Sequence, residues 1–318
     1  MQIANLPSIL QVFVVFVLLG ATPSITKAQD YNCYHKIICQ AQISCFNKNY
    51  DKGIHQYQKA FDMASAHPFD LIDISIAYLH IGKEDKALES LYAAFDRGYT
   101  LKALKEHEGV NEKLDSIQWL IVEKKYTSHR QNFFCQANME IYTQLAKMKA
   151  IDQSIRKLVH NHKDSTTWKY TEKIDQKNFQ ELQALLADNS NLTYNQLGTE
   201  SIVSAYLILL HASSYKSVDK EQVDNMLDDF LRRGYITPNQ YAIFVDRQNV
   251  FGEGKKQTYG TFNYATQFSP IEDVANIDQR RLEIGLYPLP IYVEKDGKKE
   301  LPEGYVPFEN PAEYLECN

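Results

Sequence analysis

The first half of the chain repeats itself at an interval of 34 residues. Aligning residues 50–61 with residues 84–95 places small residues opposite small ones and large residues opposite large ones. The matched pairs are Gly53 with Ala87, Ile54 with Leu88, Tyr57 with Leu91, Ala60 with Ala94, and Phe61 with Phe95. Small residues let two helices approach closely, and large residues fill the space beside them. A helix–turn–helix unit repeated at this interval predicts stacked helix pairs, because each pair buries its apolar face against the next.

This repeat resembles the tetratricopeptide family, and the second unit, IAYLHIGKEDKALESLYAAF, is the better match of two. The segment after it, RGYTLKALKEHEGVNEKLDSIQWLIVEKKY, resembles the tail that often caps such short arrays. The resemblance implies a tetratricopeptide-like helical domain over residues 29–130, with a concave surface for a protein or peptide partner. The alternative is a helical scaffold that packs against the second domain and binds nothing else.

Three helices are predicted in the second half from the spacing of apolar residues. Residues 137–162 carry an amphipathic stripe at steps of three and four. Its members are Ile141, Leu145, Met148, Ile151, Ile155, Leu158 and Val159. Residues 175–187 predict another helix, with Ile174, Leu182, Leu185 and Leu186 as its apolar residues. Residues 202–210, IVSAYLILL, are apolar almost all round, so this helix is expected to be buried at the centre of the domain.

Shorter signals follow toward the C-terminus. Val223 to Leu231 forms a further stripe, and Thr237-Pro238 is an N-cap followed by proline at the first helical position. Residues 252–267 predict a small β-hairpin or ordered loop, and a capping box at Ser269 opens the last helix. The predicted fold is mostly α: helical hairpins, then a second α-helical domain over 131–293, then an extended C-terminal tail over 294–318.

The N-terminus predicts export. Residues 9–21, ILQVFVVFVLLGA, form an apolar run that is too short to span a bilayer, and Thr26-Lys27-Ala28 supplies small residues for cleavage. We therefore expect residues 1–28 to be a cleaved signal peptide and the mature protein to be periplasmic or secreted. No membrane span is expected once the signal is removed.

Export permits disulfides, and the chain has five cysteines: Cys33, Cys39, Cys45, Cys135 and Cys317. The first three are spaced by six residues. On one helix their Cα atoms would lie about 9 Å apart, too far to bridge one another. Any bridge must therefore come from another segment, or from a Cys33 outside the helix, and the odd count leaves at least one thiol free.

Charge and motifs argue against several functions. The net charge is −6, and no basic stripe for nucleic acid is present. The GEGKK segment lacks the order of a phosphate loop, no pair of cysteines has metal-site spacing, and neither a G-x-S-x-G nor an H-E-x-x-H motif occurs. The sequence therefore predicts no cofactor and no metal.

Polar side chains gather in residues 241–286, beside enough Tyr, Phe, Ile and Val to fold. His211 and Asp246 are the candidate catalytic residues, because a histidine near carboxylates can act as a general base. The candidate ligand-binding residues are Arg247, Gln257, Tyr259, Asp273, Arg280 and Arg281. Arginines can clamp a small anionic or polar ligand through paired hydrogen bonds. The alternative is a salt-bridged network that only holds the fold together. We expect the whole set to meet in one place.

Residues of about 139–293 resemble a family of unknown function, the one numbered 6624. The matching pieces are Asp152-Gln153 with Arg156, Asp175 with Asn178, His211-Ala212, Asp246-Arg247, Gln257 with Tyr259-Gly260-Thr261, and Ile271-Glu272-Asp273 through Asp278, Arg280-Arg281 and Gly285-Leu286. The chain departs from the family pattern at residues 191–193, at Leu210 and Ser213 beside the histidine, and at Phe262. The resemblance implies no reaction.

Three functions are compatible with these features. The first is an exported cell-envelope protein whose repeat half mediates protein–protein interaction and whose second half binds a ligand or serves as a scaffold. The second is an exported hydrolase or transferase with a His/Asp/Arg pocket. The third is a purely structural helical protein. The positions of His211 and Asp246 relative to an open cleft distinguish among them.

Overall fold

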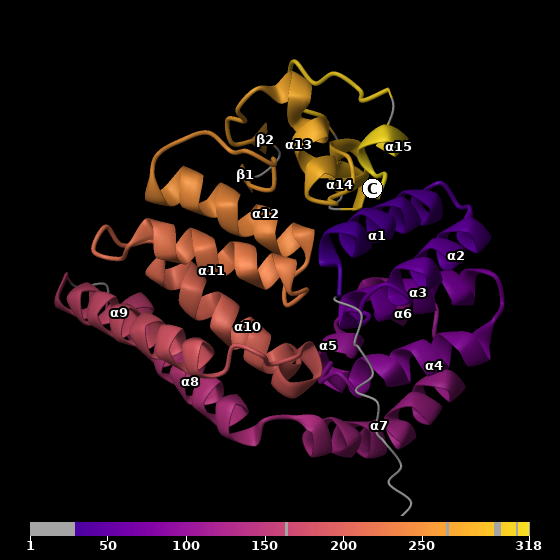
Figure 1. Cartoon of the computed structure of the whole chain (residues 1–318), viewed down its shortest axis with the longest axis horizontal. Coiled ribbons are helices and arrows are strands. Elements are labelled where there is room, and N and C mark those ends of the chain that lie inside the picture. The colour runs from indigo at the N-terminus through magenta and orange to yellow at the C-terminus, as the bar shows by residue number, and fades with distance from the viewer. Residues whose placement is uncertain (1–28, 163–164, 265–266, 296–299, 310, 318) are drawn as a thin grey trace, which may run out of the picture.

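The computed structural model describes residues 29–162, 165–264, 267–295, 300–309 and 311–317, so the predicted signal peptide lies outside the described residues. The described chain is mostly helical, as predicted. The N-terminal helices and the helices of the second half lie side by side, and the C-terminal segments sit against both (Figure 1). No helix in the described ranges is long and apolar enough to cross a membrane.

Antiparallel helix pairs build the N-terminal half. Helix α1 (Tyr31–Phe46) packs on α2 (Tyr50–Phe61), and α3 (Pro68–His80) packs on α4 (Glu84–Phe95). Two short helices follow, α5 (Leu101–Lys105) and α6 (Glu108–Asn111), and then the long α7 (Ser116–Gln136). The helical hairpins predicted from the repeat are therefore present.

The aligned windows of the repeat coincide with α2 and α4. Ala60 and Ala94 are fully buried at equivalent positions of the two helices. Gly53 is the first small position, and a Cβ placed there would come within 2.3 Å of the Cys45 sulfur of α1. The glycine therefore lets α2 approach α1 closely, as the alignment predicts.

The second half is built around a buried helix. Helices α8 (Met139–His162) and α9 (Ser165–Asp188) pack together, and α10 (Tyr194–Ala212) packs on both. Ile202, Ile208 and Leu209 are almost completely buried, which confirms the prediction that residues 202–210 are central. Helix α10 is kinked at Gly198, where φ is 74° and the Phe133 ring leaves no room for a Cβ.

Helices α11 (Lys220–Arg232) and α12 (Pro238–Arg247) follow, and Thr237 caps α12 in a capping box with Gln240, as the Thr-Pro signal predicts. A π-helical turn covers Gln248–Gly252. Strands β1 (Asn263–Tyr264) and β2 (Gln267–Phe268) pair antiparallel over two residues each. With so short a ladder, this segment is an ordered loop rather than a hairpin.

The last helices begin later than the sequence suggests. The capping box predicted at Ser269 is wrong: a 3-10 turn covers Val274–Asn276, and α13 spans Ile277–Glu283. The Ser269–Glu272 segment instead pairs with Gln257: the Gln257 N–H donates to the Pro270 carbonyl, and the Glu272 N–H donates to the Gln257 carbonyl. Helix α14 (Leu289–Lys295) tolerates Pro290 in its first turn, where an N–H is not needed.

The predicted C-terminal tail is tied to the N-terminus. It contains the single turn α15 (Pro311–Tyr314), and the side chain of Leu315 is 2% exposed. Cys317 forms a disulfide with Cys33 of α1, across 284 residues of chain. The bridge thus comes from another segment, and Cys39, Cys45 and Cys135 remain free.

Two buried histidines join the halves. His35 of α1 donates from Nε2 to the Leu231 carbonyl (3.2 Å), and His67 donates from Nε2 to the Tyr235 carbonyl (3.4 Å). Burial lowers the pKa of His35 to about 4 and that of His67 to about 3, so both rings are neutral at neutral pH. The junction therefore depends on two imidazoles without charge.

This arrangement predicts acid sensitivity. Below pH 6.5 these histidines are protonated in the unfolded chain but stay neutral in the folded protein. The free energy of unfolding therefore falls as the pH falls from 6.5 toward 4. Between pH 7 and pH 5 each histidine should cost about 2 kcal/mol of unfolding free energy. Urea unfolding should show a smaller loss for His35→Gln than for the wild type. The exposed His55 is the control, and His55→Gln should lose as much as the wild type.

The variants must be compared with the wild type because Asp70 makes stability depend on pH in the opposite direction. Its pKa is raised to about 8 by burial, so its contribution to stability is lost as the pH rises from about 4 to 8. This term is common to the wild type and both variants and cancels in their differences. If the unfolding free energy of His35→Gln depended on pH as that of the wild type does, His35 would not be the neutral buried group described here.

Removing the disulfide should destabilise the protein. Cys33→Ser should lower the unfolding free energy by about 2–5 kcal/mol, because a native cross-link restricts the unfolded chain. The free and exposed Cys135 provides the control, and Cys135→Ser should unfold like the wild type. Denaturant titrations with and without reductant would check this. A reductant effect that persists in Cys33→Ser would contradict the pairing.

Candidate functional site

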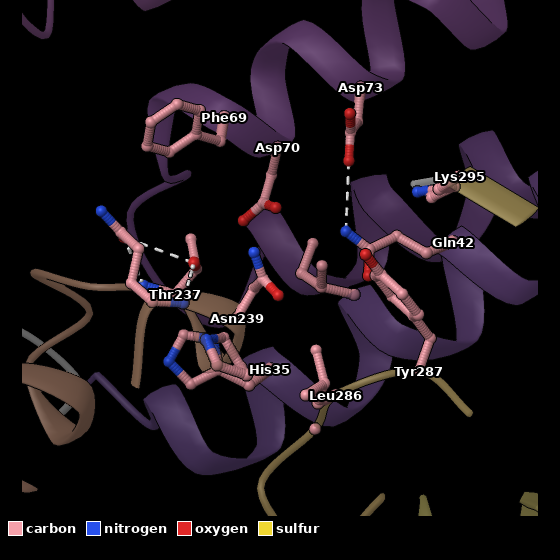
Figure 2. A pocket seen from close by; sticks show the side chains of 14 residues that line it. His35, Gln42, Phe69, Asp70, Asp73, Thr237, Asn239, Leu286, Tyr287 and Lys295 are labelled. Atoms are coloured by element: carbon pink, nitrogen blue, oxygen red, sulfur yellow. Dashed lines mark hydrogen bonds between the residues drawn. The ribbon is translucent and has the colours of Figure 1, made fainter. Parts of the chain in front are cut away.

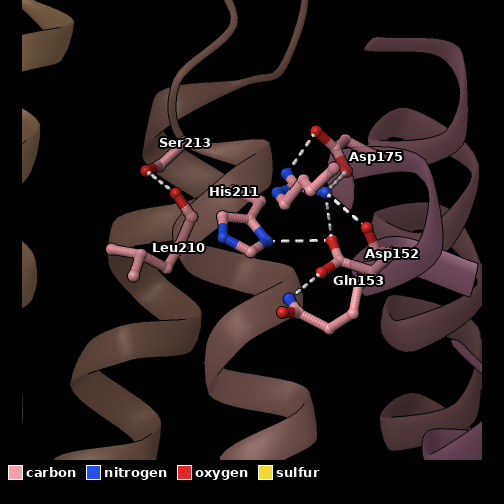
Figure 3. A network of polar contacts seen from close by, with 7 residues as sticks. Asp152, Gln153, Asp175, Leu210, His211 and Ser213 are labelled. Carbon is pink, nitrogen blue, oxygen red and sulfur yellow. Dashed lines mark hydrogen bonds and ion pairs between the residues drawn. The ribbon is translucent and has the colours of Figure 1, made fainter. Parts of the chain in front are cut away.

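Helices α8, α9 and α10 bring four charged or titratable side chains together inside the second half. They are Asp152, Arg156, Asp175 and His211 (Figure 3). Asp152 and Asp175 are 1% and 0% exposed at their side chains, and His211 is 13% exposed. Buried charges of this kind require partners, and each of the four has at least one within the cluster.

The two carboxylates occupy positions on the buried faces of their helices. On α8 the buried positions run from Ile141 through Leu145 and Met148 to Asp152, at steps of four, three and four. The predicted stripe placed Ile151 on this face, which is wrong, because Ile151 is 52% exposed while Asp152 is buried. On α9 the buried residue is likewise Asp175, next to the half-buried Ile174. A polar residue in phase with a buried stripe is the signal that could have located the cluster.

Arg156 links the two carboxylates. Its Nη1 lies 2.6 Å from Asp152 Oδ1 and 3.1 Å from Asp175 Oδ1, and its Nη2 lies 2.8 Å from Asp175 Oδ2. Burial would raise the pKa of Asp152, but hydrogen bonds from His211 and the charge of Arg156 bring it below its ordinary value. Burial raises the pKa of Asp175 despite the guanidinium. The arginine therefore serves as counter-ion for two buried acids.

His211 forms the open end of this network. Its Nδ1 lies 2.8 Å from Asp152 Oδ1. Because a carboxylate accepts hydrogen bonds, Nδ1 carries the hydrogen and the neutral ring has its lone pair on Nε2. Nε2 points away from Asp152, and no hydrogen bond from a described residue reaches it (Figure 3). The arrangement is that of an oriented base with a free acceptor nitrogen.

A cavity of about 640 Å³ lies beside His211. Its wall includes His211 and Arg156 from the cluster, Arg247 from α12, and the aromatic residues Trp168 and Tyr215. Arg247 is half-buried and makes no ion pair with a described carboxylate; its guanidinium stands 5.8 Å from the Phe251 ring. The cavity therefore offers one cation without a carboxylate partner, one base and aromatic surface.

Asp152, Asp175 and His211 each offer a ligand atom within 4.8 Å of the others, a spacing that could hold a metal ion. Arg156, however, already supplies positive charge at this place and bonds to both carboxylates. The chemistry of the four side chains is that of an ion-pair network.

Asp246, the other predicted catalytic residue, holds a loop instead. It is completely buried at the end of α12 and accepts hydrogen bonds from the N–H groups of Thr258, Tyr259 and Thr261 and from the Thr261 hydroxyl, at 2.7 to 2.9 Å. Burial raises the pKa of Asp246, and these hydrogen bonds oppose the rise. All of its partners belong to the loop that follows it.

Three more predicted ligand-binding residues reinforce this loop. Gln257 is fully buried, and its amide bonds to the backbone of Phe262 and Ser269. Arg280 donates to the carbonyls of Thr258, Glu272 and Asp273. Arg281, also fully buried, donates to the carbonyls of Tyr259 and Tyr287 and faces the Tyr292 ring at 5.1 Å. Most polar atoms of these side chains bond to backbone groups; the exception is Arg281 Nη2, which is buried without a hydrogen-bond partner.

The expectation of one common cluster is therefore wrong. Asp246, Gln257, Tyr259, Arg280 and Arg281 do meet around the loop, but His211 bonds to Asp152 in a separate network. Arg247 lines the cavity of His211. Asp273 has an exposed side chain that accepts from Asn276 and lies 3.7 Å from Arg280 Nη1, at the edge of the loop cluster. Consecutive residues Asp246 and Arg247 face different surroundings because they lie on different sides of α12.

Comparison with known proteins gives one match. A profile described as a family of unknown function (DUF6624) matches residues 138–298, in agreement with the resemblance predicted for residues 139–293. The tetratricopeptide resemblance of the first half is not confirmed by a family match. Neither the curated proteins nor the solved structures contain a significant match to the chain.

The loop network predicts a stability defect without a defect in the His211 cavity. Asp246→Asn removes an acceptor from the buried Thr261 N–H and hydroxyl. Each buried donor left unpaired costs about 1–3 kcal/mol. Chemical denaturation should show this loss, whereas the exposed Glu112→Gln should stay within about 0.5 kcal/mol of the wild type. A fully stable Asp246→Asn protein would contradict the structural role of this carboxylate.

Proposed function

We propose that this chain, which belongs to the family of unknown function DUF6624, is an exported protein that binds a small anionic ligand in the cavity beside His211. One observation carries the proposal. Within the described residues, the same cavity of about 640 Å³ is lined by Arg247, a half-buried cation without a carboxylate partner, and by His211, whose Nε2 has no hydrogen bond.

The charges around the cavity favour an anion. Asp152 and Asp175 are directed at Arg156, which neutralises part of their charge behind the wall. Arg247 is left to face the ligand, and a guanidinium pairs well with a carboxylate or phosphate. The Trp168 and Tyr215 rings line the same space, so a ligand with a flat apolar part gains additional contact.

A hydrolase or transferase is the second candidate, and the His211–Asp152 pair favours it. The carboxylate orients the ring and compensates the charge that forms when Nε2 accepts a proton. Two carboxylates face one guanidinium here, so the second carboxylate balances the positive charge that His211 gains in this step. Water or a ligand hydroxyl in the cavity would be the group deprotonated.

Export is part of the proposal because of two independent features. The apolar run at residues 9–21 and the small residues at 26–28 have the pattern of a signal peptide. The Cys33–Cys317 disulfide suits an oxidising compartment such as the periplasm or the exterior. N-terminal sequencing of protein from the envelope fraction should begin at Gln29, and a chain that keeps Met1 in the cytosol would contradict export.

We assign the first half to the binding of a protein or peptide as a tetratricopeptide-type array. Support comes from the 34-residue interval, from the coincidence of α2 and α4 with the aligned windows, and from a groove of about 620 Å³ lined by α1, α2, α3 and α6. The groove wall includes Asp73, Glu106 and Glu108, so it suits a partner with basic groups.

The anion site can be tested by fluorescence. The chain has two tryptophans, so Trp119→Phe leaves Trp168 of the cavity as the only one. Titration of this protein with phenyl phosphate and benzoate should change the Trp168 emission in a saturable manner. In the same background Arg247→Ala should weaken binding at least tenfold, about 1.4 kcal/mol. Arg232→Ala, which changes an exposed arginine of α11, should bind normally.

A His211 variant distinguishes the binding protein from the enzyme. His211→Gln keeps a donor for Asp152 and removes the base. If the protein is an enzyme, this variant should bind the anion but lose turnover of p-nitrophenyl phosphate or p-nitrophenyl acetate. Absence of saturable binding in the wild type, or equal binding by Arg247→Ala, would overturn the anion site.

A further inference from the structure

A second, smaller cavity of about 260 Å³ lies where the two halves of the chain meet. Its walls come from α1, from α3, from the N-terminus of α12 and from the turn at residues 285–287 (Figure 2). None of its residues belongs to the His211 cavity. The inference drawn from it does not depend on the anion site.

Unpaired acceptors face this cavity. Asp70 is 4% exposed, and its Oδ2 accepts a hydrogen bond from the Tyr34 hydroxyl at 2.6 Å. No hydrogen bond from a described residue reaches its other oxygen, and the carboxylate is directed toward Asn239 and Thr237 (Figure 2). Asn239 Oδ1 is also buried without a hydrogen-bond partner. One acceptor here is thus buried without a donor, Asn239 Oδ1, and the second Asp70 oxygen has no donor either, whereas buried acceptors normally have one.

The charge balance of the cavity becomes negative when Asp70 is ionised. Asp70 and Asp73 line it with a single cation, Lys295, whose ammonium group stands 4.8 Å from the Tyr287 ring. No ion pair joins Lys295 to either acid among the described residues. His35, also in the wall, is neutral because burial lowers its pKa to about 4.

The N-terminus of α12 does little to attract an anion here. Pro238 at the first helical position has no N–H, and the Gln240 N–H is bonded to Thr237 Oγ1. An anion would also meet the Asp70 and Asp73 carboxylates. A cation with several N–H donors would satisfy the unpaired oxygens and balance the charge.

We propose that this cavity binds a primary ammonium group, held by the Asp70 carboxylate and the Asn239 side-chain oxygen, with Asp73 adding negative charge. The ammonium group has three donors, which suits the open Asp70 oxygen and an amide oxygen in the same wall. Its source is either a small diamine or the side chain of a lysine in a peptide. The peptide source fits the surroundings, because Gln42, Asp73 and Lys295 also line the adjoining groove of about 620 Å³.

Binding should be linked to proton release. Burial raises the pKa of Asp70 to about 8 in the empty protein, so a cation that needs the carboxylate must displace a proton at neutral pH. Of the other groups that face Asp70, His35 and His67 are neutral above pH 6 and Tyr34 keeps its proton. Asp73 on α3 and Lys295 on α14 complete the charged surroundings.

Calorimetric titration of residues 29–318 tests the proposal. The probes are 1,4-diaminobutane and the tripeptide Gly-Lys-Gly, and butyrate is the negative control. We expect saturable binding of an amine, tightening about tenfold between pH 6.5 and 7.5, with proton release measured in two buffers of different ionisation enthalpy. Tighter binding of the tripeptide would assign the site to a peptide, and tighter binding of the diamine would assign it to a small polyamine.

Two variants separate a ligand site from a purely structural carboxylate. Asp70→Asn keeps an oxygen for Tyr34 but removes the charge, and should weaken amine binding at least tenfold and abolish the proton release. Asn239→Asp adds a charge beside the ligand and should strengthen binding, an effect that a structural role of Asp70 does not produce. Undetectable amine binding at millimolar concentration, or unchanged binding in both variants, would overturn the proposal.

Discussion

The attachment of Arg156 to two buried carboxylates is the interaction on which the second half depends. Asp152 belongs to α8 and Asp175 to α9, so the guanidinium joins two helices that the apolar core alone would only bring near each other. His211 adds α10 to the same network through Asp152. Buried ions are costly unless they are paired. The need to pair them sets the relative positions of α8, α9 and α10 where the four side chains meet. It also orients the His211 ring, since one nitrogen is held by Asp152 and the other is free.

A second polar network shapes the chain after α12 in a different manner. Asp246 binds three backbone N–H groups of the loop at residues 258–261, and Arg281 binds a carbonyl of the same loop. In this way a segment with almost no strand or helix is kept in one conformation by charged side chains inside the fold. The comparison of the two networks shows what distinguishes a candidate site from a scaffold. In the first an acceptor remains open to a cavity, whereas in the second the side chains are used by backbone groups.

The halves of the molecule are joined by two neutral histidines and a disulfide. The neutral His35 and His67 hold α11 and the turn after it, and the Cys33–Cys317 disulfide fastens the C-terminus to α1. The same junction contains the Asp70 cavity, so the first half supplies part of a cavity wall to which the family domain also contributes. Its acidic groove and that cavity share Asp73 and Lys295.

The sequence by itself determined the helices and their pairing in the first half, because a 34-residue interval and the size match between Gly53 and Ala87 depend only on local periodicity. It likewise determined the central position of residues 202–210, since a helix without a polar face must be buried. The family resemblance contained Asp152, Arg156 and Asp175, yet nothing local indicated that they meet His211. Only the tertiary structure decided this, because the four residues lie on three helices whose rotation about their axes is set by packing. A one-residue error in the apolar face of α8, Ile151 in place of Asp152, hides the buried acid. For the same reason only the structure separated Asp246 from Arg247, which are neighbours in sequence but face a loop and a cavity respectively.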